Sequence, residues 1–335
     1  MGRSLPNIHV LGTGGTIASL GVDRLDLLTY SETGKRLDVG QLLQRVPEAQ
    51  TIARVTTEQF FELPSPALGP REWLQLSKRI THLLSEDREL GGIVVTHGTA
   101  TLEETAYFLH LTVKSDKPVV VTGAMRPPSA LGTDTDVNLL RAIRVACSPA
   151  ARGKGVLTIL NEQVHSARDV TKMNTAHVDT FKPGELGFLG YADPDGEVVF
   201  YRSPTRRHTS TTEFDIAQLR DLPRVDIVSV YAGGDGLLVE ALTQHGVKGI
   251  VIASAGGGSL TPGIEKAAAD AVRRGAAVVI SSRAGSGRVF QRPKFQRNSF
   301  IAGDDLLPQK ARVLLMLGLS ATSDREQLQR MFREY

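Results

Sequence analysis

Hydroxyl-bearing residues gather in two short stretches, each directly after an apolar run. Residues 12–19 read GTGGTIAS and contain Thr16, while residues 96–101 read THGTAT and contain Thr99. A threonine hydroxyl becomes a nucleophile when a neighbouring group accepts its proton. If the fold brings the two stretches together, they could form a nucleophile site.

A lysine suited to such chemistry lies in residues 168–175, RDVTKMNT, after a third apolar run. Burial and neighbouring groups tune the pKa of a lysine, so Lys172 beside a hydroxyl could assist proton transfer. The alternative is a surface ion pair between Lys172 and Asp169, worth about 0.5 kcal/mol or less. Spacing by itself narrowly favours the surface pair.

The stretch that contains Thr99 also carries a pattern for starting a helix. The sequence TLEE matches a capping box, with Thr101 as the N-cap and Glu104 reaching back to it. Acidic side chains in a first turn suit the positive end of a helix, which also accounts for Glu103. His97 could act as a general base, although a histidine between a strand end and a glycine more often makes a structural hydrogen bond. Only the hydroxyl of Thr99 is left without a structural explanation.

Other site signatures are incomplete. The glycine-rich turn has Ile17 where a dinucleotide fingerprint needs its third glycine, and it lacks the lysine of a P-loop. Its glycines, Gly15 among them, would still let the backbone approach a small ligand closely. There is no G-x-S-x-G elbow, and the eight histidines form no metal-binding motif. We therefore expect neither a nucleotide nor a metal, and no cofactor.

The elements that must position these residues follow an α/β pattern, in which short β-branched runs alternate with amphipathic stretches. This pattern predicts mainly parallel sheets. Strands are predicted at residues 8–11, 92–96, 119–122, 156–160, 227–231, 250–253 and 277–281. Helices are predicted at residues 70–84, 138–147, 262–273, 308–319 and 324–333. Because ligands bind past the carboxyl ends of parallel strands, the polar segments after the first three strands should meet at one edge.

A composition break divides the chain into two predicted α/β domains. Residues 201–215, YRSPTRRHTSTTEFD, are rich in Ser, Thr and Arg and predict a linker. The larger N-terminal domain would comprise residues 1–200, and the smaller C-terminal domain residues 216–335. A chain of 335 residues is long enough for both.

Composition excludes several classes of protein. With 41% apolar and 22% charged residues, the chain is typical of a globular protein, and its apolar runs are too short to span a membrane. A net charge of +3 without a basic stripe disfavours nucleic-acid binding. The single cysteine, Cys147, rules out an internal disulfide and is expected to be at least half-buried. Residues 1–10 lack the apolar core of a secretory signal, which favours a cytoplasmic protein or the mature form of an exported one.

Several long motifs occur here in the order that one family has them. The chain resembles the bacterial-type L-asparaginase/glutaminase family through GTGGTIAS, VVTHGTATLEETAYFL, VVVTGAMRP, NLLRAIRVA, RDVTKMNTAHVDTF and PQKARVLLML. The resemblance implies an amidohydrolase that releases ammonia from asparagine or a related small amide without a cofactor. It also implies a homotetramer of close dimers, whose N-terminal active sites are completed by a neighbour's C-terminal domain.

The resemblance also assigns roles to residues. Thr16 matches the nucleophile, and Thr99 matches the second threonine, held near the family's lysine at Lys172. Tyr30 matches a loop tyrosine that activates the nucleophile, at a slightly altered spacing. Ser65 matches a contact to the substrate carboxylate.

Two further residues are expected to approach the substrate through the backbone. Ala124 matches a backbone contact to the substrate amide. Gly15, in the turn before the nucleophile, is expected to approach the substrate.

The chain departs from the family where the α-amino group of the substrate binds. Ala100 replaces the aspartate of HGTDT, which would contact that group through a charged hydrogen bond worth about 1.5–3 kcal/mol. Pro66 and Ser259 replace polar contacts, and residues 285–297 are basic where an acidic contact is expected. These departures predict a substrate without a free α-amino group. A binding protein that has lost turnover is the alternative, weakened by the presence of Thr16, Thr99 and Lys172.

Overall fold

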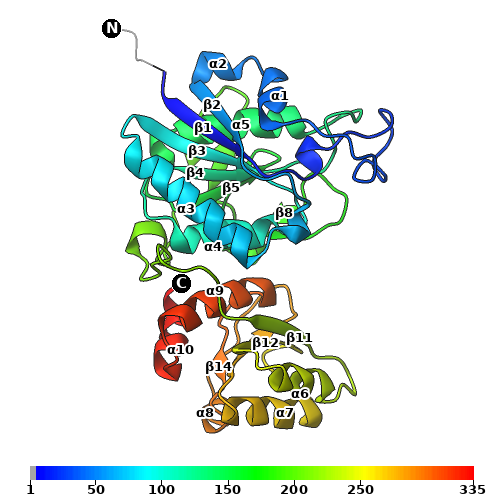
Figure 1. Cartoon of the computed structure of the whole chain (residues 1–335), viewed down its shortest axis with the longest axis vertical. Helices are drawn as coiled ribbons and strands as arrows, with labels where there is room; N and C mark the ends of the chain where they lie inside the picture. Colours follow the sequence, from blue (N-terminus) through cyan, green and yellow to red (C-terminus); the bar gives the residue numbers. More distant parts are fainter. Residues whose placement is uncertain (1–4) are drawn as a thin grey trace. The chain divides into compact units, whose positions relative to one another are not determined.

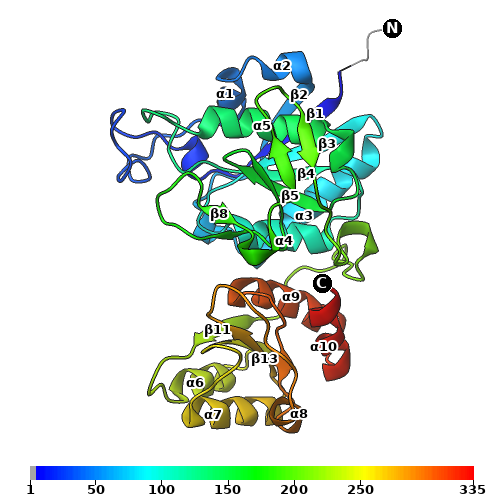
Figure 2. The same cartoon turned by 180° about the vertical axis from the view of Figure 1, so that it is seen from behind.

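The computed structural model describes residues 5–335 and divides into two compact units. Unit 1 extends to Thr212, and unit 2 is Glu213–Tyr335. Each unit is a sheet with helices packed on it, as the two views of Figures 1 and 2 show, which confirms the predicted fold class. Residues 209–212, inside the predicted linker, pack within unit 1, where Lys114 Nζ donates to the main-chain oxygen of Thr212 over 2.9 Å.

Unit 1 is built on an eight-stranded sheet with the order β10-β9-β6-β5-β4-β3-β1-β2. Its parallel part consists of β1 (Asn7–Gly12), β2 (Arg54–Gln59), β3 (Leu90–Thr96), β4 (Val119–Thr122) and β5 (Val156–Leu160). An antiparallel extension adds β6 (Gln163–Ser166), β9 (Gly190–Ala192) and β10 (Val198–Phe200). A separate hairpin joins β7 (Thr171–Lys172) to β8 (Phe181–Lys182).

The carboxyl ends of three central strands are level. Gly12 at the end of β1 pairs with Thr96 of β3, and Thr96 pairs with Thr122 of β4. The polar segments that follow these strands therefore start side by side, as predicted. The chain goes from β1 to β2 on one side and then to β3 on the other, and such a reversal of strand order is where parallel sheets bind ligands.

Helices cover both faces of this sheet. α1 (Val39–Gln44), α2 (Ala49–Ile52) and α5 (Thr135–Cys147) pack on the face that receives Val10, Val94 and Val120. α3 (Pro70–Glu86) and α4 (Leu102–Thr112) pack on the face that receives Leu11, Val95 and Val121. Because side chains alternate along a strand, burial on both faces requires the continuous apolar runs seen in the sequence. Short 3-10 turns complete unit 1 at η1 (Thr16–Ala18), η2 (Ser65–Ala67), η3 (Pro149–Ala151), η4 (Gly184–Leu186) and η5 (Thr209–Thr211).

Unit 2 has a four-stranded parallel sheet with the order β11-β12-β13-β14. Its strands are β11 (Val225–Ser229), β12 (Gly249–Ser254), β13 (Ala277–Ser282) and β14 (Ile301–Ala302). Its helices are α6 (Leu237–Gln244), α7 (Pro262–Arg273), α8 (Pro293–Arg297), α9 (Pro308–Ala321) and α10 (Arg325–Glu334). Helices α6 and α7 pack on one face, where Ile264 and Ala268 meet Ile252 and Ile280. Within residues 5–335, every helix is too short or too polar to cross a membrane.

Candidate active site

The turn after β1 touches the turn after β3, backbone against backbone. Gly14 and Gly15 have φ values of 95° and 91°, a region that favours glycine. A Cβ atom on Gly15 would lie 2.2 Å from the Cα atom of Gly98. The glycines are therefore required by close approach as well as by conformation, and Gly15 leads directly into Thr16 at the start of η1.

The hydroxyl of Thr16 meets the phenol of Tyr30. Thr16 Oγ1 and Tyr30 Oη lie 3.1 Å apart, and both residues are half-buried. The loop that carries Tyr30 is closed at its base by a hydrogen bond from Leu20 N to Lys35 O, and the Thr33 hydroxyl donates to Leu20 O over 2.6 Å. The structure thus brings these two predicted site residues together in a pair that can pass a proton.

The hydroxyl of Thr99 meets the ammonium of Lys172. Lys172 Nζ donates to Thr99 Oγ1 over 2.9 Å, and the main-chain N–H of Lys172 donates to Glu103 Oε2 over 3.2 Å. Burial lowers the pKa of Lys172, and the Glu103 carboxylate acts in the opposite direction. The narrowly favoured surface pair with Asp169 is wrong, because Asp169 pairs instead with Arg168 at 3.2 Å.

The capping-box prediction for residues 101–104 is also wrong. Thr101 is the N-cap residue of α4, but its side chain makes no capping hydrogen bond. The Thr101 hydroxyl donates to the main-chain oxygen of Ser65 over 2.7 Å instead. Glu103 lies in the first turn of α4, as predicted, but it is also buried against the backbone of Lys172. A local pattern could not reveal these partners, because they lie about 35 and 70 residues away along the chain.

The predicted substrate contacts lie against the same turns. A Cβ atom on Gly98 would lie 2.9 Å from Ser65 Oγ, so buried Ser65 borders the turn that carries Thr99. A Cβ atom on Gly123 would lie 3.1 Å from Thr99 Cγ2, which places the segment of Ala124 beside Thr99. Ala100 is exposed on this turn.

Two buried polar residues that the sequence did not single out shape the segment of Ala124. The main-chain N–H groups of Met125 and Arg126 donate to the Asp134 carboxylate over 3.0 and 2.8 Å. Asn138 Nδ2 donates to Gly123 O over 3.0 Å. Only the D-x-x-x-N spacing, which puts both residues on one side of the start of α5, could have indicated this role.

The structure favours the structural role of His97. Its ring is buried, and Nδ1 lies 2.8 Å from Gly98 O. Burial lowers the pKa of His97 to about 4, so the ring is neutral at pH 7. Cys147 is half-buried as expected, and burial raises the pKa of its thiol to about 11.

The basic residues predicted near the substrate belong to unit 2, where several already have partners. Arg292 stacks on Phe295 with 4.5 Å between the guanidinium carbon and the ring centre. Lys294 pairs with Glu265 at 2.6 Å. Ser259 lies in a tight turn and exchanges main-chain hydrogen bonds with Ala255.

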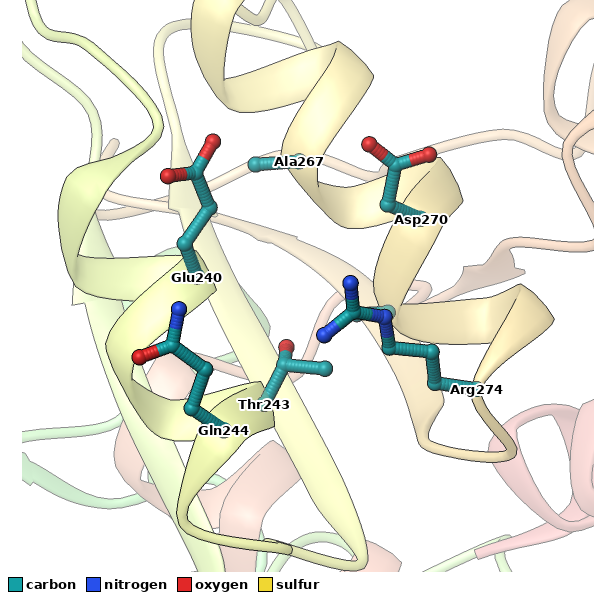
Figure 3. A pocket seen from close by; sticks show the side chains of 7 residues that line it. Glu240, Thr243, Gln244, Ala267, Asp270 and Arg274 are labelled. Atoms are coloured by element: carbon teal, nitrogen blue, oxygen red, sulfur yellow. The ribbon is translucent and has the colours of Figure 1, made fainter.

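A polar groove of about 140 Å³ lies between α6 and α7 of unit 2 (Figure 3). It is lined by Glu240, Thr243, Gln244, Ala267, Asp270, Ala271 and Arg274. None of the predicted site residues lines it, and Asp270 already pairs with Arg273. In the part of the chain from residue 5 onward, no three His, Cys, Asp or Glu side chains form a group that could hold a metal ion.

Comparison with known proteins settles the family. Residues 7–206 match the family model "Asparaginase, N-terminal", and residues 224–332 match "Glutaminase/Asparaginase C-terminal domain". The chain belongs to the asparaginase family. The resemblance inferred from its motifs is therefore confirmed.

Relatives are similar over almost the whole chain. L-asparaginase 2 of Bacillus subtilis is 46% identical, over 99% of this chain and 88% of that protein. Glutaminase-asparaginase of Pseudomonas fluorescens biotype A is 40% identical, over 99% of this chain and 91% of that protein. The crystal structure of a probable cytoplasmic L-asparaginase from Campylobacter jejuni is 41% identical, covers 98% of this chain and 100% of its own, and has a TM-score of 0.94.

Proposed function

We propose that Thr16 is the nucleophile with which this asparaginase-type amidohydrolase attacks a small amide. The observation that carries the proposal is the contact of 3.1 Å between Thr16 Oγ1 and Tyr30 Oη, on a turn packed against the one that bears Thr99. Two proton-handling pairs, Thr16–Tyr30 and Thr99–Lys172, thus lie on adjacent turns at the carboxyl ends of neighbouring strands.

The proposed reaction is acyl transfer in two halves. Thr16 Oγ1 adds to the amide carbon while its proton passes to Tyr30 Oη, which gives up its own hydroxyl proton to the amide nitrogen, and main-chain N–H groups, including that of Ala100, stabilise the oxyanion. The C–N bond then breaks, and the nitrogen, which has gained this proton, leaves as ammonia. Water adds to the resulting ester of Thr16, the Thr99–Lys172 pair relays the proton that the water loses to Thr16 Oγ1, and the bond from this oxygen to the acyl carbon breaks.

The substrate is proposed to be asparagine or a related amide that lacks a free α-amino group. Relatives named L-asparaginase and glutaminase-asparaginase leave the choice between asparagine and glutamine open. Ala100 offers no charge to an ammonium group, and Pro66 offers no polar side chain. Ser65 and the segment of Ala124 would hold the carboxylate and amide ends.

The proposed assembly is a homotetramer of close dimers, in which unit 2 of a neighbour completes each site. The support is family membership, over both the N-terminal and the C-terminal family models. We also propose a cytoplasmic location, which the Campylobacter jejuni relative is named for, although a Haemophilus influenzae relative is named periplasmic.

Ammonia release tests the reaction. We expect turnover in a panel of asparagine, glutamine, N-acetylasparagine and the deaminated analogue of asparagine, and a reduction of kcat by at least about 10³-fold in Thr16→Val. Thr51→Val is the matched control, because the exposed Thr51 hydroxyl bonds only locally to Glu48 O. Mass spectrometry of quenched reactions should find the acyl group on Thr16. Full activity in Thr16→Val would exclude this nucleophile, and tight binding without any turnover would instead identify a binding protein.

A further inference from the structure

Lys172 is held at two points by one short segment. Its side-chain Nζ donates to Thr99, and its main-chain N–H donates to Glu103, at 2.9 and 3.2 Å. Thr99 lies on the turn after β3, and Glu103 lies four residues later in the first turn of α4. Fixing both the backbone and the tip of a long side chain restricts its rotamers, so the ammonium stays directed at the Thr99 hydroxyl.

Glu103 also supplies charge at this position. Its side chain is 8% exposed, and a carboxylate is seldom buried to this degree without a partner. A nearby negative charge favours the protonated form of an amine, whereas burial favours the neutral form. Both effects act on Lys172: burial lowers its pKa, and Glu103 raises it.

Two ion pairs lie on the chain segments next to Lys172. In the β7–β8 hairpin, Lys182 pairs with Asp179 at 3.3 Å, and upstream of β7 Arg168 pairs with Asp169 at 3.2 Å. Ala100, on the turn that bears Thr99, carries no charge. Glu103 is the carboxylate that contacts the main chain of Lys172 and raises the pKa of its side chain.

We propose that Glu103 is a positioning residue of the reaction: it holds Lys172 against Thr99 and supplies the negative charge that partners the lysine ammonium. The inference rests on the proposed relay through Thr99 and Lys172. Glu103 acts through the lysine, because its carboxylate accepts a hydrogen bond from the main-chain N–H of Lys172.

Competitive acetylation of the folded enzyme at a series of pH values measures the titration of Lys172 and so tests the inference without relying on turnover. Only a neutral amine reacts, so the labelling rate of Lys172, read from its peptide by mass spectrometry, reports its titration. In Glu103→Gln the titration of Lys172 should move to lower pH. The part of the pH profile of kcat that depends on Lys172 should move with it, while KM changes less than about twofold. Glu104→Gln removes a carboxylate from the same helical turn and is the matched control.

A second variant separates charge from position. Glu103→Asp keeps the charge but shortens the reach to the Lys172 N–H. In this variant Lys172 should titrate more like the wild type, while kcat should still be reduced. If Glu103→Gln melts well below the wild type, the Glu103→Asp variant serves as the test. The inference is overturned if Lys172 titrates as in the wild type in a folded Glu103→Gln variant. It is also overturned if Glu104→Gln shifts the Lys172 titration as much as Glu103→Gln does. A shifted titration with an unmoved kcat profile supports the pairing and overturns the relay role of Lys172.

Discussion

At the scale of single residues, two threonine hydroxyls differ in what they touch. Thr16 meets a phenol, which can donate or accept a hydrogen bond, whereas Thr99 accepts one from an ammonium. A hydroxyl whose oxygen already accepts from a cation is less nucleophilic but well placed to pass a proton. This difference supports Thr16 as the attacking group and Thr99 as the relay.

Ala100 allows a direct test of substrate choice. Since this position is exposed, an aspartate fits there without being buried. Ala100→Asp should raise kcat/KM for free asparagine by about 10- to 100-fold relative to the deaminated analogue, because it restores a charged hydrogen bond to the α-amino group. Initial rates on the two amides measure the ratio. Ala100→Asn, similar in shape but neutral, should recover much less, and unchanged asparagine kinetics in Ala100→Asp would refute this view of the pocket.

At the scale of elements, the site depends on turns that pack without side chains between them. Gly15→Ala would place a methyl group 2.2 Å from Cα and 2.4 Å from N of Gly98, and backbone atoms cannot rotate away. We expect at least about 3 kcal/mol of lost stability from overpacking and strained φ. A displacement of about 1 Å at the Thr16 hydroxyl would reduce kcat by about 100-fold.

Gly153→Ala is the control for conformation alone, since Gly153 has a φ of 71° but open space around its Cβ position. It should cost about 1 kcal/mol and leave kcat unchanged. Denaturant titrations and kcat measurements on both variants decide the matter. Equal effects would mean that close approach of the two turns does not matter.

The sequence predicted the central elements well and the outer ones poorly. The strands at 119–122 and 156–160 have the predicted bounds, because they are buried on both faces and read as apolar runs. The predicted helices at 70–84 and 138–147 lie within α3 and α5. Strand β2 was missed, because none of its residues is buried and its sequence RVTTEQ carries no apolar run.

In the site, motifs identified the hydroxyls and the lysine but not the groups that hold them. The sequence explains Glu103 only as an acidic residue of a first helical turn, and it does not indicate the roles of Asp134 and Asn138. All three act through main-chain atoms distant in the sequence. Spacing along the chain indicates local hydrogen bonds and cannot rank them against long-range ones.

At the scale of the whole molecule, the division into units makes the stability of the site measurable by itself. The chain has one tryptophan, Trp73, which is 2% exposed on α3 of unit 1. Its fluorescence therefore reports the unfolding of the unit that carries Thr16, Thr99 and Lys172. Unit 2 has its own core around Ile252 and Ile280 and contributes no tryptophan signal.

This signal can test how burial of His97 couples pH to the stability of unit 1. Its pKa is lowered to about 4 by burial, against 6.5 for an unperturbed histidine. Nδ1 faces Gly98 O, and no polar atom among residues 5–335 partners Nε2, so a proton added there would be buried without an acceptor. As pH falls below 6.5 the unfolded chain binds a proton that the native unit does not, and stability falls until pH 4.

The contribution of His97 to this loss is about 3 kcal/mol between pH 7 and pH 4. In His97→Gln the free energy of unfolding from Trp73 fluorescence should be lower than in the wild type at pH 7. Its decrease between pH 7 and pH 4 should be smaller than in the wild type by about that amount. Carboxylates titrate in both proteins, so the difference between the two profiles isolates the histidine. His82→Gln, which removes a histidine ring that is 60% exposed, is the matched control. Parallel profiles for wild type and His97→Gln would show that the pKa of His97 in the native unit is close to its value in the unfolded chain. Burial would then not keep the ring neutral.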